Sequence, residues 1–300
     1  MKILVTGGAG YIGTSLVEQL NNQKKVSEIY VLDNLSRAPL SFFLGKEKLT
    51  KVKFIKGDIL DTYVLGDLIE QVDVIYHLAA YVLSPFSYEQ NVQFEQINRW
   101  GTLNLVRAVQ QSKHKIERFI YLSSASVYGL RGSVNFQDAP HPSNAYGQSK
   151  YEGEKFAQLL KGYCRVNILR SANVFGFNPS FRENSVLNHF IFDSIVYNRI
   201  LIYGDGNQFR PFVSLADVIK ALLGLLETPE STVSDAASFN ANLNEIKDWL
   251  LENHVQDLEY TYLNPAISYE QQFIEGLKTL SDVMPHLDKE FETFRENIRI

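Results

Sequence analysis

Several kinds of residue are scarce in this 300-residue chain. A single cysteine, Cys164, leaves no internal disulfide framework, which indicates a reducing compartment. The six histidines are scattered without metal-ligand spacing, so we expect no bound metal. No apolar run approaches the roughly 20 residues that cross a bilayer, and residues 1–12 lack the small-residue cleavage site of a secretory signal. We therefore expect a cytoplasmic protein without a membrane partner.

An excess of basic charge is also missing. The chain has 29 Lys and Arg against 34 Asp and Glu, a net charge of −5, so its surface is not built to neutralise a phosphate backbone and we expect no nucleic-acid partner. Hydrophobic residues make up 45% and charged residues 21%, which excludes disordered, collagen-like and coiled-coil chains. The length fits one large domain or two joined domains.

Short β-branched runs alternate with amphipathic stretches through the first half, a pattern typical of a parallel sheet with crossover helices. The expected strands cover residues 3–5, 29–32, 52–55, 74–77, 119–122 and 166–169. The expected helices cover residues 12–20, 62–71, 97–109 and 146–160. After about residue 170 the pattern predicts an apolar helix near 187–197 and a strand at 200–203, then a tail of helices from 243 onward, separated by turns at 264–265 and 284–285.

The first expected strand runs into a glycine-rich turn, TGGAGYIG at residues 6–13, which leads into a helix. Glycines at this spacing allow a tight turn, the approach of a dinucleotide pyrophosphate to the helix N-terminus, and close packing of helix on strand. The segment therefore predicts that Gly7, Gly10, Tyr11, Ile12 and Gly13 bind a dinucleotide cofactor. A plain structural turn is the alternative.

Asp33 ends the second expected strand, 20 residues after Gly13, the distance at which an acid usually binds the adenosine ribose hydroxyls. Because a carboxylate there would repel a 2′-phosphate, the sequence favours NAD over NADP. Arg37 could reach round to such a phosphate, and a turn role for Asp33 stays open. Asn34 beside it and Asp58 after the third strand are candidates for the adenosine side, with helix capping as the alternative for Asp58.

Tyr146 and Lys150 stand four residues apart, one turn along the same helix face. Tyr151 and Lys155 have the same spacing, but Tyr151 points about 140° away from Tyr146, so only one pair can face a given site. Ser124 lies at the end of the fifth expected strand. The pair that faces this serine would be the one in the site.

These residue types suit hydride chemistry at an alcohol carbon, which needs a base for the hydroxyl proton and a fixed hydrogen-bond partner for the oxygen. The pKa of tyrosine, near 10, must fall by about three units for the phenol to act at neutral pH. A positive charge about 5 Å away contributes roughly 3 kcal/mol at an effective dielectric near 20. The charges of Lys150 and of an oxidised nicotinamide are therefore sufficient to lower the pKa of the tyrosine without a metal.

Eight short motifs occur in order over residues 1 to about 220. They are TGGAGYIG at 6–13, Asp58-Ile59, HLAA at 77–80, Asn98 before Gly101-Thr102, SSASVYG at 123–129, YGQSK at 146–150, RSANVFG at 170–176, and GDG at 204–206 followed by Arg210. The ordered set resembles the NAD-dependent epimerase/dehydratase family. These extended short-chain dehydrogenases act on nucleotide sugars, as UDP-glucose 4-epimerase does.

The resemblance implies that Tyr146 is the acid/base, that Lys150 binds the nicotinamide ribose and depresses the pKa of Tyr146, and that Ser124 holds the sugar oxygen. His77 is expected to be a strand-end residue rather than a catalyst. Further implied residues are Ile59, Leu78, Ala79, Ala80 and Asn98 for the cofactor, and Ser84, Asn173 and Arg210 for the substrate, the last two at its diphosphate. A plain helix-start role for Asn98 and a surface role for Arg210 stay open.

The chain also departs from the family pattern. Phe175 replaces the usual tyrosine, no proline follows Gly176, and proline rather than aspartate follows Arg210. Ala125 and Ser126 stand where the 4,6-dehydratases carry an aspartate and a glutamate. The resemblance therefore implies that a water-eliminating acid is missing.

We expect an α/β fold, with a Rossmann-type doubly wound parallel sheet over residues 1–172 and a smaller mixed α/β substrate domain over 173–300. The chain is expected to return to the first domain near 212–218 and 238–240. The favoured function is epimerisation of a nucleotide-activated sugar by transient C4 oxidation. A reductase or dehydrogenase of a nucleotide-linked keto sugar would use the same residues, whereas a non-catalytic NAD-sensing regulator would not need them. The resemblance also implies a homodimer through the helices near 97–109 and 146–160.

Overall fold

The computed structural model describes residues 1–37, 42, 49–82, 91–130, 132–182, 185–266 and 269–298. Its larger sheet has seven parallel strands in the order β11-β7-β5-β4-β1-β2-β3. The strands are β1 Lys2–Thr6, β2 Glu28–Asp33, β3 Val52–Lys56, β4 Val74–His77, β5 Arg118–Ser124, β7 Arg165–Ser171 and β11 Thr232–Ala236. All six expected strands are present. β11 was not expected, because this edge strand reads TVSDA and only Ala236 in it is fully buried.

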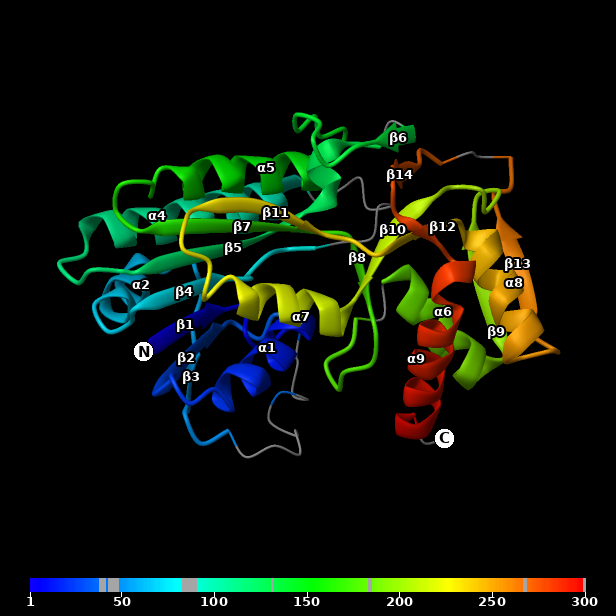
Figure 1. The fold of residues 1–300 in the computed structure, drawn as a ribbon, viewed down its shortest axis with the longest axis horizontal. Helices are drawn as coiled ribbons and strands as arrows, with labels where there is room; N and C mark the ends of the chain where they lie inside the picture. The colour runs from blue at the N-terminus through cyan, green and yellow to red at the C-terminus, as the bar shows by residue number, and fades with distance from the viewer. Residues whose placement is uncertain are drawn as a thin grey trace.

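Helices cover both faces of this sheet, as Figure 1 shows. One face carries α1 (Tyr11–Asn21) and α7 (Leu215–Gly224), whose apolar residues share one core with β1 and β2. The other face carries α2 (Thr62–Ile69), α4 (Thr102–Gln111) and α5 (Ala145–Gln158), which share a second core. The expected doubly wound α/β fold is therefore confirmed. Strand order reverses beside β1, and ligands of such sheets bind outside the carboxyl ends of the strands at that point.

The helix expected at 97–109 is divided in the structure. A short helix α3 (Asn91–Gln93) is followed by the π-helical segment η2 (Phe94–Gly101), and only then by α4. π-helical turns are rare and frequently occur at functional sites.

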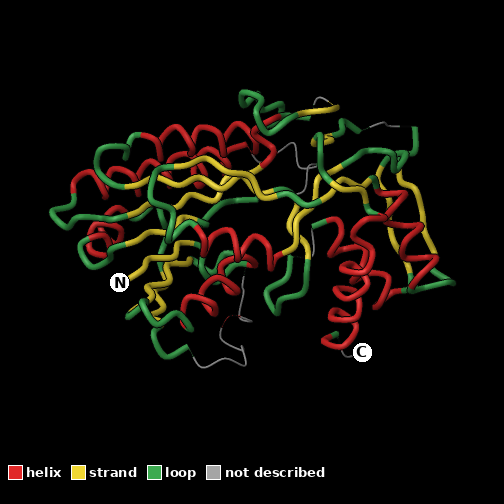
Figure 2. Tube along the Cα trace, viewed as in Figure 1, coloured by secondary structure: helices red, strands yellow, loops and turns green. Residues whose placement is uncertain are grey.

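The remaining elements form a second region beside the first sheet, and Figure 2 shows its helices and short strands. A four-stranded sheet has the order β15-β12-β10-β8, and two further pairs join β13 to β9 and β14 to β6. The strands are β6 Gly132–Val134, β8 Asn173–Phe175, β9 Arg199–Tyr203, β10 Arg210–Ser214, β12 Phe239–Ala241, β13 Glu259–Leu263, β14 Gln272–Ile274 and β15 Lys278–Thr279. The helices are α6 Val186–Tyr197, α8 Leu243–Asn253 and α9 Met284–Asn297, and aromatic side chains dominate their shared core.

Three details of this region differ from the sequence-based expectation. The chain returns to the first sheet through α7 and β11, whereas residues 238–240 reach β12, which pairs with β10 in the second sheet. Residues 259–263 form a strand and not part of a helix, because they pair in parallel with β9. Pro285 lies in the first turn of α9, where its missing N–H costs no helical bond, so it starts a helix instead of separating two. Every helix in the described parts of the chain is too short or too polar to cross a membrane.

Candidate active site

The glycine loop adopts the geometry that a dinucleotide needs. Gly7 has a positive φ of 70°, and a Cβ there would lie 2.6 Å from the backbone nitrogen of Ala79. A Cβ on Gly13 would lie 2.4 Å from the carbonyl oxygen of Gly7. Gly10 precedes the first turn of α1, and no side chain caps this helix. The backbone of Gly7, Gly10, Tyr11, Ile12 and Gly13 thus surrounds a helix N-terminus that fits a pyrophosphate.

The Tyr11 side chain does not point toward this loop. Its hydroxyl donates a 2.6 Å bond to the carbonyl of Gly176, which follows β8, and burial raises the pKa of the phenol. Two further hydrogen bonds join α1 to the loop that follows β8. Asn178 donates to Ser15, and Thr14 donates to Ser180. Only the backbone of Tyr11 therefore belongs to the predicted cofactor site.

Acidic and amide side chains meet at the carboxyl ends of β2 and β3. The Asp33 carboxylate accepts bonds from the backbone N–H of Ala9 (3.1 Å) and Leu35 (2.8 Å), and burial raises its pKa. Asn34 donates a 2.8 Å bond to Asp58. Asp58 also accepts a turn bond from Leu60, while the N-cap of α2 is Asp61. The capping alternative for Asp58 is therefore wrong.

Arg37 contacts the segment that follows β4. Its guanidinium donates to the carbonyl of Val82 and faces Tyr81 and Tyr146. Burial lowers the pKa of this guanidinium.

The segment after β4 lies against the glycine loop. The backbone N–H of Leu78 and of Ala79 donate to Thr6, at 3.1 Å and 3.3 Å. Ala80 is half-buried in the same segment. Ile59 instead packs into the core, where a Cβ on Gly101 would lie 2.3 Å from its side chain.

Two buried polar residues support the site from behind. His77 contacts the hydroxyls of Thr6 (2.7 Å) and Thr102 (2.9 Å), and burial, with the nearby charge of Lys150, lowers its pKa to about 3. A neutral histidine held by two hydroxyls is a structural residue, as expected. Asn98, within η2, bonds to both backbone groups of Tyr81 and donates to Ser149 on α5 at 2.9 Å. It links three segments of the site, so the helix-start alternative does not describe it.

Ser124 and Tyr146 meet in the structure. Ser124 ends β5, and its side chain caps the short helix Ala125–Tyr128. Its hydroxyl also lies near enough to Tyr146 to lower the pKa of the phenol. The ring of Tyr146, at the start of α5, packs on Phe94 with centroids 5.8 Å apart. The other tyrosine of the helix, Tyr151, instead lies under the ammonium of Lys155 at 4.5 Å. Tyr146 is therefore the tyrosine that faces the serine.

The protein groups around the Tyr146 phenol act on its pKa in both directions. Burial raises the pKa, while Arg182, the hydroxyl of Ser124 and Arg37 lower it. The ammonium of Lys150 lies 4.3 Å from the centre of the Tyr121 ring. Burial lowers the pKa of Lys150 itself to about 7.

Arg182 was missed by the sequence analysis. It lies in the loop after β8, where its charge faces Tyr146, Tyr11 and Arg37, and burial, with the charge of Arg37, lowers its pKa to about 10. The available signal was a single basic residue in the Asn- and Pro-containing loop that follows the RSANVFG motif.

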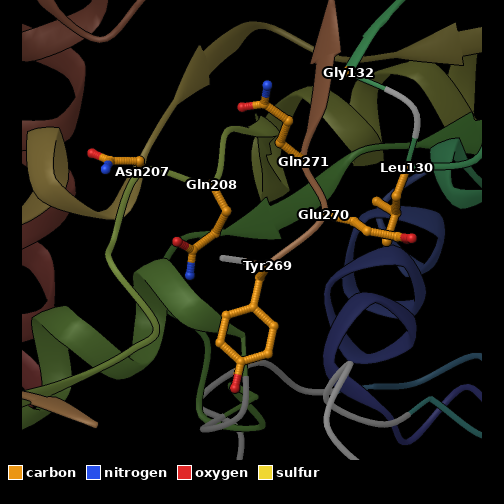
Figure 3. A pocket seen from close by; sticks show the side chains of 7 residues that line it. All are labelled: Leu130, Gly132, Asn207, Gln208, Tyr269, Glu270 and Gln271. Atoms are coloured by element: carbon orange, nitrogen blue, oxygen red, sulfur yellow. The ribbon is translucent and has the colours of Figure 1, made fainter. Parts of the chain in front are cut away.

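On the substrate side, Asn173 and Arg210 lie on neighbouring strands. Asn173 donates to the carbonyl of Pro211 at 3.0 Å. Arg210 donates to the carbonyls of Phe209 and Glu270, both at 2.8 Å, and burial lowers its pKa to about 10. Beside them is a cavity of about 460 Å³ (Figure 3), lined by Leu130, Gly132, Asn207, Gln208, Tyr269, Glu270 and Gln271. Ser84 lies outside the described residues.

The described residues contain no cluster of three or more His, Cys, Asp or Glu side chains able to hold a metal. The geometry instead fits a dinucleotide, because the glycine loop leaves space at a helix N-terminus and the Asp33 carboxylate lies against that loop.

A family comparison agrees with this arrangement. Residues 3–241 match the model of the NAD dependent epimerase/dehydratase family. The chain belongs to this family. NAD is therefore its cofactor.

Three relatives illustrate the range of this epimerase/dehydratase family. The uncharacterized UDP-glucose epimerase YtcB of Bacillus subtilis is 33% identical over 237 residues, which cover 76% of this chain and 73% of that protein. The dTDP-D-glucose 4,6-dehydratase of Mus musculus is 33% identical over 237 residues, 76% of this chain and 65% of that protein. The crystal structure of UDP-glucuronic acid 4-epimerase from Bacillus cereus, in complex with UDP-glucuronic acid and NAD, superposes with a TM-score of 0.85 at 25% identity, covering 99% and 100% of the two chains.

Proposed function

We propose that this family member epimerises a nucleotide-activated sugar by transient oxidation at C4 and return of the hydride to the same carbon. The observation that carries the proposal is that Ser124, at the carboxyl end of β5, faces Tyr146, which lies one helical turn before Lys150 on α5. A serine, a tyrosine and a lysine in this arrangement suit proton transfer at an alcohol.

NAD, when bound, supplies the hydride acceptor. The amides of the glycine loop would hold its pyrophosphate, and Asp33 would accept hydrogen bonds from the adenosine ribose. Lys150 would donate to the nicotinamide ribose. Asn34, Asp58, Ile59, Leu78, Ala79, Ala80 and Asn98 would shape the remainder of this site.

Tyr146 would take the proton from the sugar C4 hydroxyl and later return it, while Ser124 holds the oxygen. A buried phenol resists ionisation, so the phenolate needs positive charge nearby. Arg182 and Arg37 supply such charge from two loops that face Tyr146. The base would therefore be supported by two arginines as well as by the lysine of its own helix.

The second region would bind the substrate. Arg210 and Asn173 would bind the diphosphate there, since guanidinium groups suit charge-assisted bonds to phosphate oxygens. Ser84 remains a proposed contact of the sugar. The division into a cofactor domain over 1–172 and a substrate domain over 173–300 is part of the same proposal.

Relatives at similar identity are named as epimerases and as dehydratases, so one observation must favour one of them. Ala125 and Ser126 follow Ser124 in this chain and carry no carboxylate. Elimination of water from a sugar needs an acid at the departing hydroxyl, and these positions cannot provide it. This favours epimerisation.

We further propose a cytoplasmic homodimer that pairs through η2, α4 and α5. Trp100 on η2 is 52% exposed and Leu159 at the end of α5 is 53% exposed, and such an interface would cover both side chains. Light scattering coupled to size exclusion tests the dimer, and a monomeric mass at micromolar concentration rejects it.

The test of the activity is interconversion of C4 epimers without added nicotinamide, with UDP-glucose, UDP-glucuronic acid and dTDP-glucose as substrates. An epimerase converts at least one of them catalytically. Activity that requires stoichiometric cofactor would favour the reductase alternative. NAD binding without any turnover would favour the sensing regulator.

A further inference from the structure

Gln272, the first residue of β14, has a buried amide that joins two parts of the chain far apart in sequence. It is 3% exposed, and its Nε2 donates to the carbonyl oxygens of Ala125 at 2.8 Å and of Gly129 at 3.0 Å. Both partners are acceptors, so the amide uses its two N–H donors on them. The two carbonyls lie at the start and just after the end of the short helix η3 (Ala125–Tyr128), which is therefore held at both ends.

Helix η3 begins directly after Ser124 and is bonded to the side chain of that residue. The Ser124 hydroxyl accepts from the backbone N–H of Ser126 at 3.2 Å and donates to the Ser126 hydroxyl at 3.1 Å. Because the serine is tied to η3 in this way, a displacement of the helix also displaces the hydroxyl that is proposed to hold the sugar oxygen.

The backbone around Gln272 binds the segment that carries Arg210. The N–H of Gln272 donates to the carbonyl of Phe209 at 3.0 Å. Two residues earlier, the carbonyl of Glu270 accepts the 2.8 Å bond from the Arg210 guanidinium. Residues 270–272 are therefore bonded both to the proposed diphosphate ligand and to the short helix that follows the proposed substrate serine.

The same stretch borders the cavity of about 460 Å³ that Figure 3 shows. Glu270 and Gln271 line this cavity together with Gln208, which precedes β10, and Leu130, which lies two residues after η3. A ligand in the cavity is therefore within reach of both of the segments that Gln272 joins.

We propose that Gln272 is a positioning residue that couples the diphosphate subsite at Arg210 to the position of Ser124. The proposal rests on the proposed function, in which Arg210 binds the diphosphate and Ser124 holds the sugar oxygen. These two groups act on different parts of one substrate, so their separation must match the distance between the diphosphate and the reacting carbon. Gln272 sets this separation, because its backbone bonds to one side and its side chain to the other.

Gln272→Met and Asn240→Leu form a matched pair of variants, since each replaces a buried amide that holds β14 by an apolar side chain of similar size. Asn240 on β12 bonds to both backbone groups of Ile274, at 2.8 Å and 3.0 Å, and so holds the same strand from the second sheet. We expect Gln272→Met to lower kcat for C4 epimer exchange by about 10- to 100-fold, the loss typical of a misplacement of about 1 Å, with affinities for UDP and NAD within about threefold of wild type. Asn240→Leu keeps the wild-type kcat per folded molecule.

The split between kcat and binding distinguishes positioning from structural support. Equal kcat values in the two variants overturn the proposal, and so does a wild-type kcat in Gln272→Met. A loss of UDP affinity of about tenfold or more in Gln272→Met also overturns it, because the residue would then act on binding itself. If Gln272→Met does not fold, Gln272→Asn decides, since its shorter amide cannot reach both carbonyls, and a wild-type kcat in that variant rejects the proposal.

Hydrogen exchange separates this proposal from the proposed function. UDP and dTDP are the probes, because they carry the diphosphate and lack the sugar. Binding of either to the NAD-loaded wild-type protein should slow amide exchange in η3 as well as at residues 204–212, whereas in Gln272→Met only residues 204–212 should be protected. If wild type epimerises no sugar but this difference appears, the proposed function fails and the role of Gln272 stands. Protection of η3 in Gln272→Met, or its absence in wild type, rejects the role of Gln272 whatever the activity.

Discussion

The two regions of the molecule place their polar side chains by different means. In the first region, Asp33, His77 and Ser124 each end a parallel strand of the larger sheet, so one rigid edge sets their separation. In the second region, Asn173 and Arg210 stand on strands of three and five residues, next to loops and an aromatic core. The first arrangement suits chemistry that must be repeated without change. The second allows the bound substrate to vary while the chemistry stays the same.

The largest effect is expected at Tyr146, the proposed catalytic tyrosine of the first region. Tyr146→Phe removes the hydroxyl that exchanges the proton, so the rate of C4 epimer exchange should fall by about 10² to 10⁴ with folding and NAD binding intact. Tyr151→Phe is the matched control on the same helix and should leave turnover nearly unchanged. Equal losses in the two variants, or no loss in either, would remove Tyr146 from the catalytic role.

The next effect belongs to the second region. Arg210→Ala should weaken binding of the nucleotide sugar by about 30-fold or more, because losing a charge partner in a closed site typically costs roughly 2 to 5 kcal/mol. NAD affinity should stay the same, since the residue lies outside the first sheet. Calorimetric titration with UDP and with NAD measures both. An unchanged affinity for every nucleotide tested would make Arg210 a structural residue of β10.

A smaller effect tests the close packing of the glycine loop. Gly13→Ala places a methyl group 2.4 Å from the carbonyl of Gly7, and overpacking of this kind costs about 1 to 3 kcal/mol. NAD affinity and thermal stability should both decrease. Gly66→Ala, in α2, is the control, because nothing lies within 4 Å of the added Cβ, and alanine there should stabilise the helix by up to about 1 kcal/mol. Normal NAD binding by Gly13→Ala would contradict the cofactor role of the loop.

The smallest effect concerns the choice of cofactor. We expect NAD to bind at least about tenfold more tightly than NADP, a difference of about 1.4 kcal/mol, because the Asp33 carboxylate lies beside the glycine loop. Asp33→Asn should remove most of that preference. Equal binding of NAD and NADP by the wild-type protein would contradict the ribose role of Asp33, and Arg37→Ala would then show whether that side chain holds the 2′-phosphate.

What the sequence predicted correctly was local. The turn at residues 6–13, the strand that Asp33 ends and the helix that carries Tyr146 and Lys150 are all set by neighbours in the chain. Buried parallel strands also have continuous apolar runs, so six strands of the larger sheet were found to within a few residues.

What the sequence did not predict depends on long-range pairing. β11 is polar and becomes a strand because β7 offers it an edge. The pairing of β12 with β10 in the second sheet was also not predicted, since nothing in a three-residue strand specifies its partner. Arg182 lies 36 residues from Tyr146 in sequence, and their proximity comes from the loop that α1 holds through Tyr11 and Ser15.

The orientation of the side chains on the π-helical segment η2 depends on the number of residues in that segment. The Asn98 side chain hydrogen-bonds to Ser149 and to the backbone of Tyr81. Three residues later, Gly101 has no side chain and so leaves space for the side chain of Ile59. Deleting one residue just before Asn98 would restore α-helical winding, and the preceding residues would turn by about 100° relative to α4. The ring of Phe94, which packs on Tyr146, would rotate away from the active site. Single-residue insertions and deletions in this segment should therefore be far less tolerated than substitutions on its exposed side.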